Sequence, residues 1–256
     1  MVHLSTAQML AWINSFLWPL TRILGMIAVA PVFGSRSVPV MIKVSFGVVL
    51  AVLIAPTLVN VPTIDPVSLD GMLITIEQLI IGVAMGFTIQ VVFASVDLAG
   101  DLMGMSMGLG FASFYDPQTR ATTPALSQFL TLITTMLFLT LDLHLALLST
   151  LVESFTTLPI GLGIPNHASM WMRIAGTGSI IFTSGVQLAL PIIAALLVTN
   201  IALGILTRAA PQLNLFGIGF PITMSVGFIM VMVILPYLAA PIKKILELGI
   251  VFAGLK

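Results

Sequence analysis

Long apolar stretches alternate along the chain with short segments that hold most of its charged and turn-forming residues. A transmembrane helix needs roughly 20 predominantly apolar residues. Six segments reach about that length with almost no charge, at about 7–32, 40–60, 71–98, 125–149, 175–207 and 216–242. The pattern predicts an all-α integral membrane protein built from about six apolar segments.

Some of these segments are too long or too interrupted to be straight spans. The segment at 175–207 would be about 50 Å long at 1.5 Å per residue, whereas the hydrocarbon core is about 30 Å thick. Proline removes a backbone hydrogen bond and bends a helix, and it interrupts the segments at Pro19, Pro31, Pro56, Pro191 and Pro236. Broken helices at membrane depth need protein or a water cavity around them. We therefore expect kinked helices and helical hairpins buried among partner chains.

Composition agrees with a membrane location. Hydrophobic residues make up 59% of the chain and charged residues 7%, against about 25% in soluble domains. Nine basic residues balance nine acidic ones, so no basic patch for nucleic acid is available. The chain has no cysteine, which excludes disulfides and thiolate chemistry. The first basic residue is Arg22, whereas a cleaved signal peptide opens with positive charge, so we expect the first segment to be retained as a helix.

Two sets of glycines recur at helical spacing. Gly100, Gly104 and Gly108 stand every fourth residue, and Gly82 and Gly86 form a second pair. A helix face without side chains lets another backbone approach closely. These glycines are predicted to be helix-packing positions.

Three methionines, Met103, Met105 and Met107, lie among the glycines of the first set. Methionine is unbranched and polarizable, so it conforms to varied shapes. Beside a glycine face these side chains have two interpretations. They either fill the helix contact, or they form a deformable gasket around a passing chain.

An aromatic stretch follows the glycine run. Gly108 and Gly110 permit a sharp change of direction, and an Asp-Pro pair marks a turn after the aromatics. The residues concerned are Gly108, Gly110, Phe111, Phe114, Tyr115, Asp116 and Pro117. One interpretation is an interfacial aromatic belt. The other is a loop that folds into a cavity and occludes it.

Four charged residues lie in or beside apolar segments: Arg22, Glu77, Asp97 and Asp101. A charge in mid-span costs roughly 2.5–3.5 kcal/mol on insertion scales, so it usually faces protein or water and pairs. Arg22 is predicted to pair with Glu77 or Asp97. The carboxylates either form such pairs and interfacial contacts or serve as an ion or proton relay.

Enzymatic chemistry has little support in the sequence. Ser106 lies in a G-x-S-x-G pattern, but that nucleophile motif needs a strand–turn–helix context, and this stretch is predicted to be helical. Asp142 and His144 are two residues apart and would point to different faces of a helix. No metal-ligand spacing is present. We expect no catalytic residue, no metal site and no cofactor.

Motifs along nearly the whole chain resemble the FliR/SctT family of type III secretion export-gate proteins. The N-terminal third holds Arg22, Pro31-Val-Phe-Gly34, Val38-Pro39 and Pro56. The middle holds Glu77 to Gly82, Gly86-Phe87, Asp97-Leu-Ala-Gly100 and Asp116-Pro117-Gln118. The most specific match is Leu188-Ala-Leu-Pro191, then Leu203-Gly204, Arg208-Ala-Ala-Pro211, Asn214-Leu-Phe-Gly217, Pro221 and Gly227.

The resemblance implies a single export-gate domain over 1–256, present in one copy with FliP and FliQ in a hetero-oligomeric gate that contacts FlhB. Unfolded flagellar proteins would pass through its pore in the inner membrane, at the base of the flagellar basal body. The loop at 108–122 would be the pore plug. Energy would come from the proton gradient and an associated ATPase rather than from chemistry in this chain.

Two other protein classes remain as alternatives. A small secondary transporter would use Asp97, Asp101 or Glu77 as coupling groups and Pro191 as a helix break. An intramembrane hydrolase would rest on Ser106.

Overall fold

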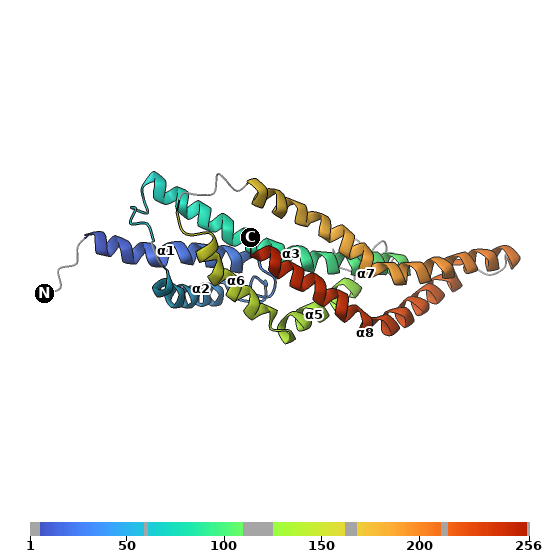
Figure 1. The fold of residues 1–256 in the computed structure, drawn as a ribbon. Coiled ribbons are helices and arrows are strands. Elements are labelled where there is room, and N and C mark those ends of the chain that lie inside the picture. The colour runs from blue at the N-terminus through green and yellow to red at the C-terminus, as the bar shows by residue number, and fades with distance from the viewer. Residues whose placement is uncertain (1–5, 59–60, 110–124, 162–167, 211–214, 255–256) are drawn as a thin grey trace. The chain divides into compact units, whose positions relative to one another are not determined.

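The chain folds into helices joined by turns (Figure 1). The computed structural model describes residues 6–58, 61–109, 125–161, 168–210 and 215–254, and no strand occurs among them. The helices are α1 (Thr6–Val29), α2 (Val40–Ile54), α3 (Leu69–Met107), α5 (Ala125–Thr140), α6 (Leu143–Thr157), α7 (Ala168–Ala209) and α8 (Phe220–Ala253). A 3₁₀ turn, η1 (Ala55–Thr57), follows α2, and a π-helical turn, η4 (Leu215–Gly219), leads into α8. The predicted all-α fold is confirmed.

Five stretches are long and apolar enough to cross a membrane: Gln8–Val29, Val40–Thr57, Leu69–Met107, Met172–Ala209 and Gly217–Ala253. The bent pair α5 and α6 brings the number to six if it is one span. These stretches correspond to the six apolar segments of the sequence. The chain is therefore an integral membrane protein.

The fourth apolar segment differs from the prediction because it breaks. α5 ends at Thr140, and α6 begins at Leu143. Asp142, at the break, has a left-handed backbone with φ of 55° and ψ of 22°, and the N–H of Ala146 donates to its carbonyl oxygen at 3.1 Å. Aspartate tolerates this conformation better than most residues, so it ends one helix and starts the next.

The prolines behave in two ways. Pro19, Pro191 and Pro236 lie inside helices that continue past them. Figure 1 shows a bend in the middle of α8, the helix that contains Pro236 and Pro241. Pro31 instead follows the end of α1, and Pro56 lies in the 3₁₀ turn after α2.

The chain forms two compact units, each assembled from separate stretches. Unit 1 comprises Met1–Val91, Asp142–Thr177 and Glu247–Lys256, and unit 2 comprises Val92–Leu141 and Gly178–Leu246. Three helices, α3, α7 and α8, contribute residues to both. No single cut in the sequence separates the units. The single domain over 1–256 stays a prediction.

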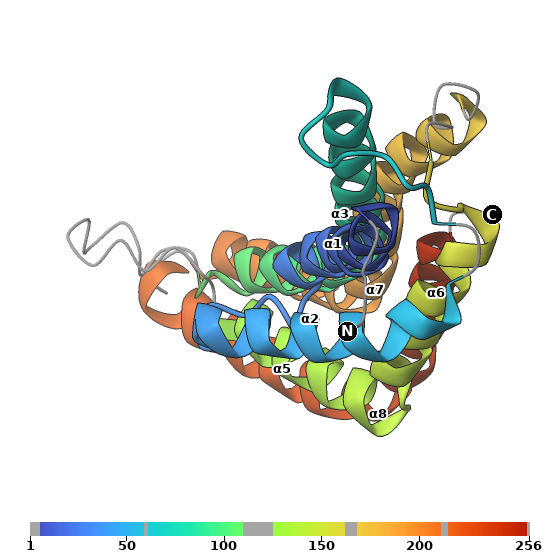
Figure 2. The same cartoon turned by 90° about the vertical axis from the view of Figure 1, so that its left-hand side faces the viewer.

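In unit 1, α1 packs against α2, which lies across it (Figures 1 and 2). The rings of Phe33 and Phe46 stack with their centres 5.9 Å apart and support the connection between these helices. Trp18, Ile23 and Met26 of α1 are fully buried. The buried face of α1 therefore belongs to the core of this unit.

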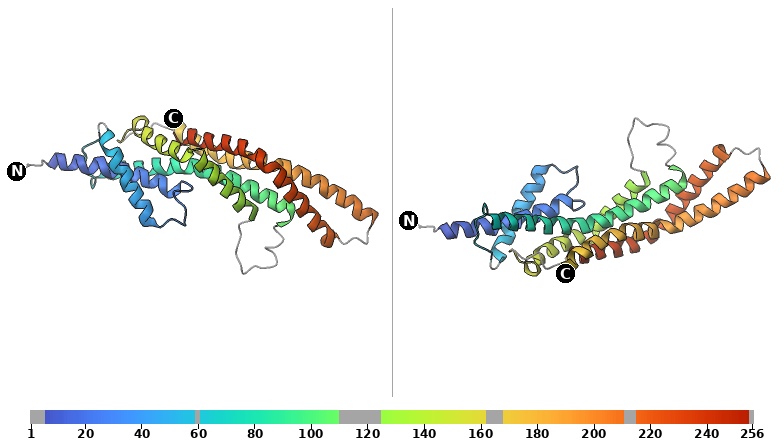
Figure 3. Two further views of the ribbon diagram at one scale, coloured as in Figure 1. Left: turned by 90° about the horizontal axis from the view of Figure 1, so that it is seen from below. Right: turned by 90° about the horizontal axis from the view of Figure 1, so that it is seen from above.

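In unit 2, the second part of α3 contacts α5, α7 and α8. The rings of Phe93 and Phe138 meet edge to face, 6.0 Å apart. Gly185 of α7 lies close to the carbonyl oxygen of Ser95. The unit 2 parts of α7 and α8 run alongside each other in opposite directions (Figure 3).

Apolar surface remains uncovered on several membrane-length helices. The share of buried residues is 67% in the most apolar window of α3, but 17% in that of Val40–Thr57, 28% in α7 and 22% in α8. Large exposed side chains on these helices include Met41, Phe182, Ile201, Met232 and Tyr237. Lipid or other chains must cover these faces, because an apolar patch of this size would not stay in water.

Candidate functional site

The end of α3, where the predicted plug begins, is fixed by a glycine. Gly108 has a φ of +84°, a backbone conformation that glycine adopts without strain. Its N–H donates to the carbonyl oxygen of Met105 at 3.0 Å. A methyl group at Gly108 would lie 2.6 Å from the ring of Phe220, the first residue of α8. The chain thus leaves α3 at a point held by α8.

The predicted plug itself lies outside the described residues. Of its named members, Gly110, Phe111, Phe114, Tyr115, Asp116 and Pro117 fall in the range 110–124. Their role as a plug stays a prediction, and Gly108 is the one named member that has a described position.

The structure separates the three methionines proposed as a gasket. Met103 and Met107 are fully buried, whereas Met105 is 60% exposed. Met107 lies against Gly227 of α8, where an added methyl group would meet its Cε at 2.7 Å and its Sδ at 2.9 Å. The hydroxyl of Thr223 donates to the Met107 carbonyl oxygen at 3.4 Å. Met103 and Met107 therefore fill contacts in this chain, and Met105 is the member that presents its side chain outward.

Gly82 and Gly86 lie where α3 crosses α1. A methyl group at Gly86 would lie 2.7 Å from the carbonyl oxygen of Met26, and one at Gly82 would overlap the carbonyl oxygen of Arg22. Gly25 of α1 faces the carbonyl oxygen of Leu79 in the same way, at 2.8 Å. The two helices therefore touch backbone to backbone, in the close approach that small residues permit.

Gly100 and Gly104 are buried in unit 2. A methyl group at Gly100 would meet the backbone of Ser127 on α5, with its nitrogen at 2.7 Å. This contact brings the hydroxyl of Ser127 to α3, where its one proton is shared between two acceptors, the Asp101 carboxylate and the Asp97 carbonyl oxygen at 3.0 Å. The glycine face thus sets the distance between α3 and α5.

Asp97 and Asp101 share one face of α3, as their spacing indicates, and both contact α5. Asp101 is half-buried, and Asp97 is exposed and accepts from the hydroxyl of Thr131 at 3.4 Å. Glu77 lies elsewhere, in unit 1, so the structure does not assign the three carboxylates to the same unit. Among the described residues no group of His, Asp and Glu side chains is arranged to hold a metal ion.

Arg22 makes several hydrogen bonds inside unit 1. It is fully buried. Its Nε and Nη2 donate to Oε1 of Gln78 at 2.8 and 2.5 Å. Its Nη1 donates to the carbonyl oxygen and hydroxyl of Ser154 at 2.9 and 3.0 Å, and Nη2 donates to the carbonyl oxygen of Leu158 at 2.8 Å. The ring of Phe155 covers the guanidinium, 4.2 Å from its centre.

These contacts explain how a cation is accommodated in a membrane-length helix. The carbonyl oxygens of Ser154 and Leu158 belong to the C-terminal end of α6, which carries partial negative charge and favours a cation. Arg22 thereby joins α1 to α3 and α6. Its hydrogen-bond partners are neutral oxygens, whereas the sequence predicted Glu77 or Asp97. Glu77 is close enough for its charge to act on the guanidinium, and Asp97 contacts Thr131 in the other unit.

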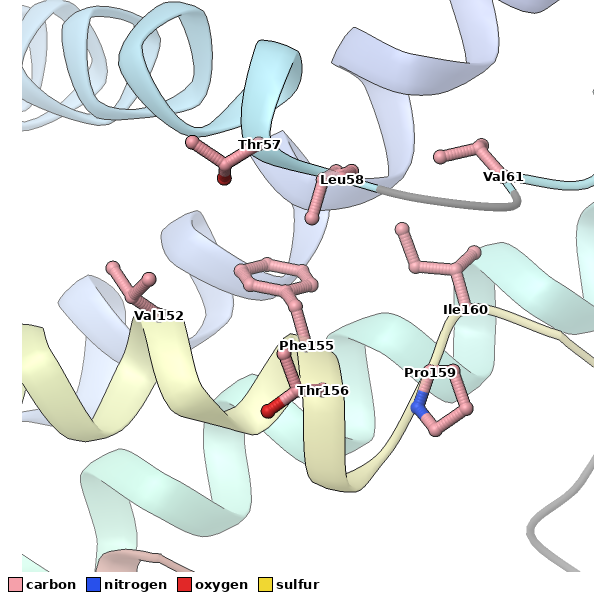
Figure 4. A pocket seen from close by; sticks show the side chains of 8 residues that line it. All are labelled: Thr57, Leu58, Val61, Val152, Phe155, Thr156, Pro159 and Ile160. Carbon is pink, nitrogen blue, oxygen red and sulfur yellow. The ribbon is translucent and has the colours of Figure 1, made fainter.

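Phe155 also lines a cavity of about 300 Å³ in unit 1. Figure 4 shows Thr57, Leu58 and Val61 on one side of this cavity and Phe155 and Ile160 on the other. Its lining holds no charged side chain. The lining is mainly apolar, with Thr57 and Thr156 as its polar residues.

The hydrolase interpretation finds no support in the geometry. Ser106 lies within the continuous helix α3, and its hydroxyl donates to the carbonyl oxygen of Leu102 at 2.7 Å. A nucleophile elbow would need a strand leading into a helix. Asp142 and His144 lie at the start of α6, in unit 1, whereas Ser106 belongs to unit 2.

Several residues with structural roles were not singled out from the sequence. Gln78, Ser127 and Ser154 hydrogen-bond charged side chains, and Phe220 and Gly227 hold the end of α3. Gln78 and Ser127 share one recognisable property: they interrupt apolar segments, where polar side chains commonly bond between helices. Ser154 follows the end of such a segment. The contacts of Phe220 and Gly227 with the end of α3 follow only from the packing, although Gly227 is also one of the residues that carry the family resemblance.

Comparison with known proteins gives one consistent result. The sequence model of the family described as bacterial export proteins, family 1, matches residues 13–249. The flagellar biosynthetic protein FliR of Escherichia coli K12 is 42% identical over 241 residues, which cover 93% of this chain and 91% of that protein. FliR of Pectobacterium carotovorum is also 42% identical, over 92% of this chain and 90% of its own length. FliR of Buchnera aphidicola from Acyrthosiphon pisum is 33% identical, over 96% and 95%.

Proposed function

The chain belongs to the bacterial export proteins of family 1 and is a membrane component of the flagellar protein-export apparatus, and from this premise we propose that it forms part of the export pore. Unfolded flagellar proteins would cross the inner membrane through this pore, at the base of the basal body. The chain would be needed for flagellum assembly. It would supply shape and packing, without catalysis and without a cofactor.

The uncovered apolar helices are the observation that carries this proposal. α7, α8 and the stretch Val40–Thr57 bury 28% or less of their most apolar windows, whereas α3 buries 67%. A chain of this kind provides large surfaces for other membrane subunits. We propose that FliP and FliQ cover part of these surfaces in a hetero-oligomeric gate and that FlhB contacts the assembly.

The gate would be formed by 108–122. Gly108 ends α3 in a left-handed conformation and so permits the chain to turn away from the helix axis. Phe111 and Phe114 would fill the closed pore, and Met105, exposed one turn before the loop, would lie near its narrowest ring. A pore wide enough for an unfolded chain would leak ions unless apolar groups closed it by excluding water.

Deleting 110–116 tests the gate. The deletion should raise the ion conductance of the assembled apparatus in planar bilayers and leave its subunit composition unchanged. Replacing the same residues by a Gly-Ser stretch of equal length should have the same effect, because length alone would not fill the pore. A control variant, Thr140→Ala, changes an exposed helix end in α5 and should conduct like the parent. Conductance equal to the parent in both loop variants would favour the aromatic-belt interpretation.

Purification tests the assembly. The chain should aggregate when expressed alone and become monodisperse when it is co-expressed with FliP and FliQ. A chain that is monodisperse alone and binds a small solute would contradict the pore proposal. It would favour the secondary transporter, with Asp97, Asp101 and Glu77 as groups to substitute next.

A further inference from the structure

One face of α1 in unit 1 carries polar side chains that have no access to solvent. Asn14, Trp18 and Arg22 follow one another at intervals of four residues, so they share this face. Each is 0% exposed, as is Gln78 on α3. A polar row of this kind inside a membrane-length helix needs hydrogen-bond partners, because unsatisfied polar groups are costly away from water.

Three atoms on or beside this face have no hydrogen-bond partner in the described part of the chain. They are Oδ1 of Asn14, Nε1 of Trp18 and Nε2 of Gln78. Arg22 is not among them, since all three of its side-chain nitrogens donate to protein oxygens. The set contains one acceptor and two donors.

The amide orientations of the two carboxamides are fixed by their other contacts. Gln78 must point Oε1 at Arg22, because two N–H groups of Arg22 donate to that atom. Asn14 must point Nδ2 at the carbonyl oxygens of Pro62 and Ile64, to which it donates at 3.0 and 2.7 Å. Exchanging O and N in either group would set donors against donors or acceptors against acceptors. Neither amide can therefore rotate to give its remaining atom a partner without losing these bonds.

The register of the helices brings the three atoms to one region. Arg22 faces Gly82, and Met26 faces Gly86, so α1 and α3 run parallel with matched turns. Trp18 is one turn before Arg22, and Gln78 is one turn before Gly82. Asn14 is one turn before Trp18, on the same face of α1. Trp18 and Gln78 are thus level with each other, and Asn14 lies one turn before them.

We propose that unit 1 binds ordered water between α1 and α3, and that this water accepts hydrogen bonds from Trp18 Nε1 and Gln78 Nε2 and donates to Asn14 Oδ1. Water is both donor and acceptor, so it matches a set of two donors and one acceptor. A lipid or a partner chain cannot supply these bonds, because none of the three side chains is exposed. An ion is not required, since the charge of Arg22 is met by protein oxygens.

Such water would complete a polar layer that runs along α1 from Asn14 to Arg22. Backbone contact at Gly82 and Gly86 holds the helices together at one end of this layer. Water-mediated bonds would hold them at the other end, at the level of Trp18. The inference concerns the fold of unit 1 and does not depend on the gate.

The direct test is a density map of the assembled apparatus at a resolution that shows ordered water elsewhere in its helices. The expected result is a peak within hydrogen-bond distance of Trp18 Nε1 and of at least one of the other two atoms. A map that resolves other buried water but shows no peak there overturns the proposal.

A second test changes one atom. Incorporating 3-benzothienylalanine at Trp18 replaces the ring N–H by sulfur and keeps the shape of the side chain. We expect the melting temperature of the assembled apparatus to fall by about 2–4 °C, since a donor to bound water is lost. The matched control is the same replacement at Trp12, which is 65% exposed on the same helix and should leave the melting temperature unchanged. An unchanged or raised melting temperature for the Trp18 variant overturns the proposal, because removal of an unsatisfied donor costs nothing.

Discussion

Arg22 directs two of its N–H groups at a single oxygen, Oε1 of Gln78, with Nε at 2.8 Å and Nη2 at 2.5 Å. The contact joins α1 to α3 in the interior of unit 1. Bonds from a charged donor are stronger than bonds between neutral groups. A neutral side chain thus serves as a principal partner of a buried cation.

Replacing Gln78 with leucine should destabilise the protein by about 3 kcal/mol, because two hydrogen bonds to a charged group are lost and their donors stay buried. Thermal denaturation of the purified apparatus measures this loss. Gln78→Glu is the matched variant: it keeps acceptor oxygens for Arg22 and should lose much less. Equal melting temperatures for the leucine variant and the parent would show that Arg22 finds other acceptors.

Gly82→Ala should weaken the contact between α1 and α3, because a methyl group there would overlap the carbonyl oxygen of Arg22. Overfilled contacts of this kind cost about 1–3 kcal/mol. Gly178→Ala is the control, since nothing lies within 4 Å of its added methyl group, and alanine in a helix is favoured over glycine by about 1 kcal/mol. The yield of assembled complex should fall for the first variant only. The opposite ranking would contradict the backbone contact.

Met107 and Gly227 should be energetically coupled. Gly227→Ala presses a methyl group onto the side chain of Met107 and should destabilise the junction of α3 and α8. In a Met107→Ala background the obstructing side-chain atoms are absent, so Gly227→Ala should then cost much less stability. A double-mutant cycle of melting measurements should give a coupling of about 1 kcal/mol. Additive effects would mean that Met107 simply moves aside.

Ser106→Ala should change stability by no more than about 0.5 kcal/mol, as is usual for substitutions without a special role. The hydroxyl bonds only to the carbonyl oxygen of Leu102 one turn back, a contact that contributes little to a helix. Motility on soft agar and the amount of assembled complex should both match the parent. Complete loss of motility with normal assembly would restore the hydrolase interpretation.

The helices could be predicted from apolar runs, but their ends could not. The predicted segment 216–242 stops at Lys243, whereas α8 continues to Ala253. α3 likewise continues through Asp97 and Asp101 to Met107. Charged side chains end an apolar run without ending the backbone hydrogen bonds of a helix. The break at Asp142 was missed for the converse reason, since neither glycine nor proline marks it.

The partners of Arg22 show where sequence reasoning about the site reaches its limit. The cost of a buried charge predicts that Arg22 has partners, and it has them. That cost does not distinguish a carboxylate partner from carbonyl oxygens at the end of a helix. Those oxygens come from α6, more than 130 positions away, so only the fold brings them to α1.

Positions at the crossing of α1 and α3 differ in how well they tolerate substitution. The two backbones touch at Gly25, Gly82 and Gly86, and the contact depends on the lack of a side chain at these positions. Every substitution at these three positions adds atoms, so each can loosen the crossing and none can tighten it. Substitutions at the surrounding exposed positions do not add atoms to a tight contact, so these positions can accept different apolar residues. Mutational scans should therefore show three intolerant points on helices whose outer faces accept most apolar changes.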